Sequence, residues 1–106
     1  MRVLTFIPAV DNPSIQHISS APGTIERIIG GPIAVQRLPN IMRNAVLIYN
    51  ANAQIPNRIV DGHAVNGVIM IVRIKNGELA NLPLNVAEHM RDNCKWPAAQ
   101  WVEVAG

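Results

Sequence analysis

The chain has 106 residues, a formal net charge of +2 and one cysteine, Cys94. This length corresponds to a single domain, 1–106, and so weak a positive charge argues against nucleic-acid binding. One cysteine excludes an internal disulfide and a thiolate-rich metal site, and no apolar run is long enough for a signal peptide or a membrane span. We therefore expect a cytoplasmic protein that does not contact membranes.

The first third of the sequence predicts a hairpin followed by a short helix. Residues 2–7 form an apolar strand that Pro8 closes, and 14–19 form a second strand after a turn cluster at 11–13. Apolar residues at helical spacing predict a helix of about two turns within 22–31. We expect Gly30 or Gly31 to adopt the left-handed conformation at its end.

The middle of the chain contains the most apolar strands. Residues 32–38 and 45–49 are predicted strands, and the second is apolar enough to be buried on both faces. Residues 50–66 contain four clusters of turn-forming residues and predict a long irregular loop, with only a short bridge at 59–60. A loop of this length in a small domain is usually functional or mobile.

The last third predicts a hairpin, a helix and a tail. Residues 68–74 form an apolar strand, and Asn76-Gly77 is typical of a type I′ turn into 78–82. A second helix is predicted over 85–92, and a last short strand within 96–104. The elements together predict an α+β fold: a small, mostly antiparallel sheet of about five to six strands with two helices.

The composition bears on assembly. Charged residues are only 15% of the chain and hydrophobic residues are 49%, whereas an average globular domain has roughly 25% charged residues. One interpretation is a surface rich in neutral polar groups, because asparagine is abundant. The other, which we favour, is a homo-oligomer in which a second copy covers apolar surface.

The Pro56-Asn57-Arg58 triplet lies in the predicted loop and is the clearest candidate for a binding site. Asparagine offers a donor and an acceptor, and arginine offers a planar fork that suits phosphate or carboxylate. The alternative is structural: Asn57 caps a turn while Arg58 pairs with Asp61. His63 lies in the same loop, but no nucleophile accompanies it.

No other pattern indicates catalysis or a cofactor. The three histidines have no metal-ligand spacing, and Gly30-Gly31 follows a helix, whereas a phosphate loop precedes one. Cys94 is followed by Lys95, a cation that can lower a thiol pKa, but an incidental thiol is the simpler interpretation. We therefore expect no catalytic residues, no metal and no cofactor.

Five short motifs in order resemble a domain-of-unknown-function family, number thirty-eight forty-six, found in phages, plasmids and some bacteria. They are the opening Met1-Arg2-Val3-Leu4, the junction Ile28-Ile29-Gly30-Gly31-Pro32-Ile33, an apolar strand ending in Asn50, the triplet Pro56-Asn57-Arg58, and Gly67-Val68-Ile69. The resemblance covers roughly residues 1–75. It implies a mobile-element protein that acts in the cytoplasm of a host bacterial cell, but it carries no established activity.

Two functions follow as hypotheses. The first is a phage-type protein that sequesters a nucleotide-derived host immune signal, in a pocket formed within one chain or between chains. Its ligand-binding residues are Arg58 for phosphate, Asn57 and Asn50 for base or ribose, Tyr49 for stacking, and His63 from the loop. The alternative is a protein-binding inhibitor that blocks a host protein through a sheet edge or through the segment with Trp96 and Trp101. An enzyme is the least favoured class.

Overall fold

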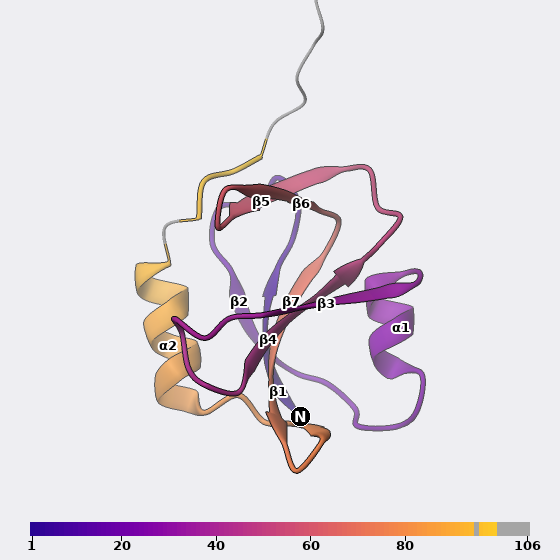
Figure 1. The fold of residues 1–106 in the computed structure, drawn as a ribbon, viewed down its shortest axis with the longest axis vertical. Helices are drawn as coiled ribbons and strands as arrows, with labels where there is room; N and C mark the ends of the chain where they lie inside the picture. The colour runs from indigo at the N-terminus through magenta and orange to yellow at the C-terminus, as the bar shows by residue number, and fades with distance from the viewer. Residues whose placement is uncertain (95, 100–106) are drawn as a thin grey trace, which may run out of the picture.

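The computed structural model describes residues 1–94 and 96–99. Eight strands and two helices are formed within them: β1 (Arg2–Phe6), β2 (Ser14–His17), α1 (Thr24–Ile29), β3 (Ile33–Arg37), β4 (Ala45–Asn50), β5 (Pro56–Val60), β6 (His63–Asn66), β7 (Ile69–Lys75), β8 (Glu78–Ala80) and α2 (Leu84–Asn93). The predicted α+β class is confirmed. A six-stranded antiparallel sheet and a two-stranded sheet are accompanied by two helices (Figure 1).

The large sheet has the order β2-β1-β7-β4-β3, and β8 pairs with β7 beside this path. Every pairing is antiparallel. The two most apolar strands, β4 and β7, are neighbours in the middle, which explains why both are nearly continuous hydrophobic runs. The sheet is covered on both faces.

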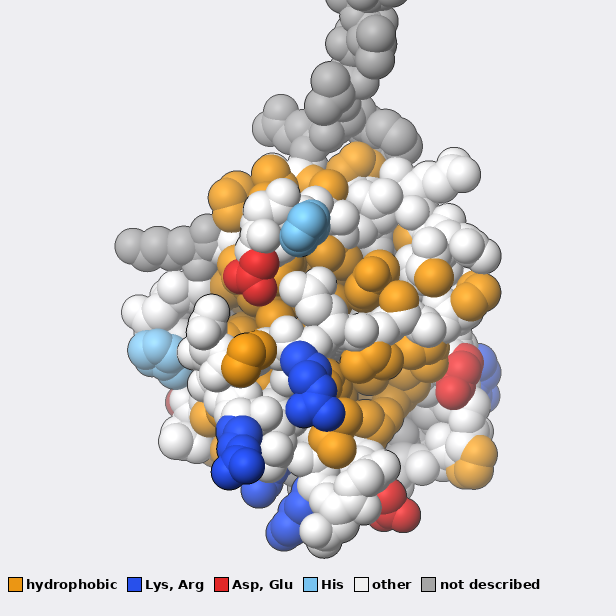
Figure 2. Space-filling model, viewed as in Figure 1, with side chains coloured by type: hydrophobic (Ala, Val, Ile, Leu, Met, Phe, Trp, Pro, Cys, Tyr) orange, Lys and Arg blue, Asp and Glu red, His pale blue; other side chains and the backbone are white. Residues whose placement is uncertain are grey.

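One face of the sheet packs against α2 and the small sheet, and the other packs against α1 (Figure 1). Because side chains alternate along a strand, Leu47 of β4 faces α2 while Ile48 faces α1. Several large apolar side chains stay exposed, among them Val35 and Ile55, and hydrophobic side chains gather across the middle of the face in Figure 2.

Turn chemistry places the helix end and one hairpin as predicted. Gly30 ends α1 in the left-handed conformation with φ of 83°, and its N–H donates to the carbonyl of Glu26 at 2.8 Å. Asn76 and Gly77 both have positive φ, as a type I′ turn requires. Both predictions are confirmed, Gly30 being the capping glycine of the two proposed.

The prediction of an irregular loop over residues 50–66 is wrong. Strands β5 and β6 form a hairpin there, and Asp61 and Gly62 make its turn with φ values of 50° and 81°. Asp-Gly is itself a strong hairpin signal, but Pro56 and the polar residues around it hide the alternation of the flanking strands. Only the segment 51–55 connects β4 to the hairpin without a strand.

The segment after α2 lies along the outer side of β5. The N–H of Ile59 donates to the carbonyl of Pro97 at 2.8 Å, and the N–H of Ala99 donates to the carbonyl of Asn57 at 3.0 Å. A single bridge joins Arg58 and Ala98. The last predicted strand thus begins with strand-like pairing, and its remainder, with Trp101, lies outside the described residues.

Candidate functional site

Asn57, the first candidate ligand-binding residue, is buried and holds three parts of the fold together. Its side chain is 1% exposed. Its Nδ2 donates to the carbonyl of Phe6 at 2.8 Å and to the carbonyl of Gly67 at 2.7 Å. Asn57 therefore fastens β5 to the end of β1 and to the residues before β7. Its role in the structure is to satisfy buried backbone carbonyls.

Arg58 is buried as well, and it lies in strand β5 rather than in the predicted loop. Its Nη1 donates to Asn57 Oδ1 at 2.8 Å, and its Nη2 donates to the carbonyls of Val10 and Asp11. Its guanidinium lies over the ring of Phe6, 5.5 Å from the centroid. The terminal nitrogens are occupied within the protein, and the postulated Arg58–Asp61 pair is absent from the ion pairs of the described residues.

The other three candidates do not join this cluster. Tyr49 and Asn50 are successive residues of β4 and point to opposite faces of the sheet. Tyr49 packs on the α2 side, whereas Asn50 lies against Gly31 and its Oδ1 accepts from the N–H of Asn52 at 2.9 Å. His63 is exposed at the start of β6. The five residues are thus not arranged around one site.

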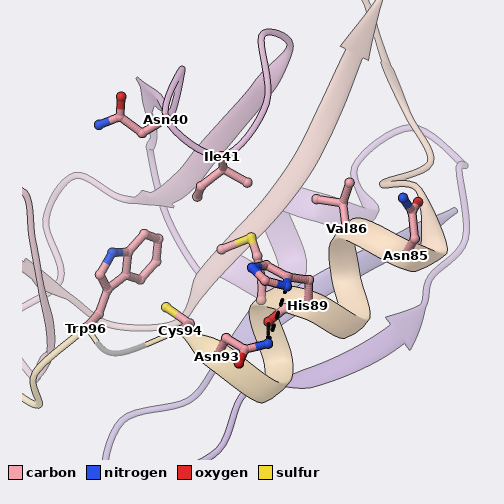
Figure 3. A pocket seen from close by; sticks show the side chains of 9 residues that line it. Asn40, Ile41, Asn85, Val86, His89, Asn93, Cys94 and Trp96 are labelled. Atoms are coloured by element: carbon pink, nitrogen blue, oxygen red, sulfur yellow. Dashed lines mark hydrogen bonds between the residues drawn. The ribbon is translucent and has the colours of Figure 1, made fainter.

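A hollow of the described structure lies elsewhere, between α2 and the β3–β4 connection (Figure 3). Its volume is about 530 Å³, within the range of small-molecule sites. Nine residues line it: Asn40, Ile41, Asn85, Val86, His89, Met90, Asn93, Cys94 and Trp96. We call this hollow the α2 pocket.

The helix supplies most of the α2 pocket because of its spacing. Residues Asn85, His89 and Asn93 follow at intervals of four and share one face of α2. Opposite them, Ile41 of the β3–β4 connection points toward the helix, and Trp96 stands at one end of the pocket (Figure 3). The lining combines an apolar floor with a row of polar groups.

The polar groups of the α2 pocket are neutral amides and one imidazole. Asn93 Nδ2 lies 3.3 Å from His89 Nδ1 and donates to the carbonyl of His89 at 3.0 Å. No lysine, arginine, aspartate or glutamate is among the nine described residues that line the pocket, and these residues offer hydrogen bonds without a fixed charge.

Cys94 and Trp96 complete the pocket next to the core. Burial raises the pKa of the Cys94 thiol, and a hydrogen bond from the backbone of Trp96 and the charge of Arg58 oppose this only partly. The thiol is therefore a poor nucleophile at neutral pH. The indole of Trp96 packs on Phe6 with ring centroids 5.1 Å apart. This contact fixes the orientation of the indole relative to the pocket.

Sequence reasoning did not identify this pocket. The spacing Asn85-x-x-x-His89-x-x-x-Asn93 was the available signal. That spacing alone is typical of a solvated helix face. What makes it a pocket is the approach of the β3–β4 connection, which the sequence does not reveal.

Within residues 1–94 and 96–99, no helix has the length and apolar character needed to cross a membrane. No group of three or more potential metal ligands of the His, Cys, Asp or Glu type gathers in the same residues. Comparison with family models, curated proteins and solved structures finds no match to this chain, so the family resemblance stays a prediction.

Proposed function

We propose that the chain is a non-catalytic binding protein that sequesters a small, uncharged, planar ligand group in the α2 pocket. The ligand class that fits is the nucleobase or nucleoside part of a nucleotide-derived signal. The observation that carries the proposal is the lining itself, in which three asparagine amides and an imidazole surround an apolar floor beside an indole. This extends the sequence-based hypothesis to a different site.

Each part of the lining supports recognition of a base. Amides offer a donor and an acceptor side by side, which matches the edge of a nucleobase. Ile41, Val86 and Met90 give an apolar surface for the ring faces, and an aromatic side chain such as Trp96 contributes about 1–3 kcal/mol when a base stacks on it. The amides then provide specificity, and the apolar surface that the ligand removes from water provides affinity.

None of the nine described lining residues is an acidic or basic side chain of the Asp, Glu, Lys or Arg type. A phosphate buried among these nine residues would lose its hydration without gaining such a cation from them. The phosphates of a nucleotide therefore remain in solvent, and a nucleoside should bind about as tightly as its monophosphate. A site built on Arg58 would instead favour the monophosphate strongly.

The direct test is ligand capture. The protein is incubated separately with nucleosides, their monophosphates, cyclic dinucleotides and ADP-ribose, separated from free ligand, and heated to release what it holds. Release of an intact compound supports sequestration. Release of an altered compound shows an enzyme, and no uptake of any compound contradicts the proposed ligand class.

Variants locate the site. Asn85→Ala and His89→Ala each remove a polar group from the pocket and should weaken binding at least tenfold while leaving the melting temperature within about 2 °C, because both residues are exposed. Asn12→Ala is the matched control, an exposed asparagine in the β1–β2 connection. Equal affinity for all three variants would place the ligand elsewhere.

A further inference from the structure

Strand β3 forms an open edge of the large sheet. Among residues 1–94 and 96–99 it pairs only with β4, at the end of the strand order. The N–H of Leu38 donates to the carbonyl of Ala45 at 3.0 Å, and that of Ala51 to the carbonyl of Pro32 at 2.8 Å. Because alternate residues of an edge strand face the neighbour, Ile33, Val35 and Arg37 direct their N–H and C=O groups outward.

The side chains of this edge are exposed too. Val35 is 58% exposed and Ile33 is 36% exposed, and hydrophobic side chains gather over β3 in Figure 2. Proteins usually protect an edge strand with a bulge, a proline or several charges. Strand β3 pairs without a register shift and carries one charge, Arg37. The opposite edge, β2, is shorter and largely polar.

We propose that this edge pairs antiparallel with the same edge of a second copy, about a two-fold axis at Val35. In that register Val35 lies opposite Val35 of the other copy, and Ile33 lies opposite its Arg37. Each of the three pairs exchanges two hydrogen bonds, about six in all. The two large sheets become one continuous sheet through an isologous interface.

Charge favours a second copy in this register. Ile33 and Glu26 line one hollow beside α1, and Arg37 points to the same sheet face as Ile33. Pairing about Val35 brings Arg37 of each copy next to Ile33 of the other, and hence toward Glu26. Neither charge forms an ion pair among the described residues of one copy. A register centred on Arg37 would oppose like charges, which is unfavourable.

The size of the interface sets the expected affinity. One five-residue strand and a few apolar side chains make a contact at the small end of specific interfaces. A dissociation constant of about 10–100 µM is the corresponding scale. Sedimentation velocity from a few micromolar to several hundred micromolar should therefore show the mass rise from 11.6 kDa to about twice that value. A single 11.6 kDa species throughout would overturn the proposal.

Two substitutions at the axis should abolish the dimer. Val35→Lys places two positive charges opposite each other, and Val35→Pro removes the outward N–H without removing a β3–β4 hydrogen bond. Each should raise the dissociation constant more than tenfold. Val35→Thr keeps the β-branched shape and the N–H, and it should still dimerise. Dimers that persist in both disruptive variants would place the interface elsewhere.

The charge pair gives a second, independent test. Glu26→Arg and Arg37→Glu should each weaken the dimer severalfold, and the double variant should restore it; additive weakening would refute the register. Hydrogen exchange requires no variant: the amides of Ile33, Val35 and Arg37 should gain protection as concentration rises. If the chain stays monomeric but captures a foreign protein in a Val35-dependent way, the edge serves a different partner and the second-copy proposal is wrong.

Discussion

Removing the Arg58 guanidinium should destabilise the fold, in contrast to what an exposed loop arginine would do. Arg58→Ala leaves Asn57 Oδ1 and the carbonyls of Val10 and Asp11 without their donors. A hydrogen bond to a charged group contributes about 1.5–3 kcal/mol. Part of that gain offsets the cost of burying the charge, so we expect a net loss of about 2–4 kcal/mol.

This loss corresponds to a large shift in melting temperature. For 106 residues the entropy of unfolding is about 0.22 kcal/mol/K, so the melting temperature should fall by roughly 9–18 °C. Calorimetry and urea unfolding measure the two quantities independently. Arg58→Lys keeps the charge but loses the fork, and it should recover only part of the loss.

The control is Arg43→Ala, because Arg43 is exposed and makes no hydrogen bond among those of the described residues. A surface substitution of this kind changes stability by about 0.5 kcal/mol or less. If Arg58→Ala unfolds with the same midpoint as Arg43→Ala, the buried hydrogen bonds of Asn57 and Arg58 do not hold the two sheets together. Our interpretation of the triplet is then wrong.

Three further predictions concern stability and reactivity. Asn57→Leu orphans the carbonyls of Phe6 and Gly67 and should cost about 2–4 kcal/mol in urea unfolding; an unchanged midpoint would contradict this. Gly31→Ala places a Cβ 2.6 Å from Asn50 Nδ2 and should lower the free energy of unfolding by about 1–3 kcal/mol. The double variant Gly31→Ala/Asn50→Ala should recover most of this loss, and additive losses would refute the clash. Because burial raises the Cys94 pKa, stability should be complete below the pKa of an unfolded cysteine and decline as pH rises through the folded value. Cys94→Ser should remove that decline.

Most of the fold was predictable because its strands and turns are locally encoded. A few neighbouring residues are enough to predict several elements. Examples are the apolar runs of β4 and β7, the glycine at the end of α1 and the Asn76-Gly77 turn. The β5–β6 hairpin was missed because its strands carry polar residues inward. Asn57 and Arg58 look like binding residues, but their partners lie about 50 positions away in the sequence, which no local pattern shows.

The site was harder to predict for the same reason. Asparagine and arginine in a presumed loop are typical of ligand contacts, and equally of buried residues that hydrogen-bond backbone carbonyls. Only long-range packing distinguishes the two roles. The α2 pocket depends on how the β3–β4 connection meets the helix. Its residues come from positions 40–41 and 85–96, so composition and spacing gave no means of joining them.

The most direct test of the α2 pocket uses Cys94, the only cysteine of the chain, which lines it. The measurement is the rate of labelling by a thiol-reactive disulfide reagent, with and without saturating amounts of a captured nucleoside. A ligand in the pocket covers the thiol, so we predict at least tenfold slower labelling, and loss of this protection in Asn85→Ala at the same nucleoside concentration. An unchanged rate at saturation would contradict binding in the α2 pocket.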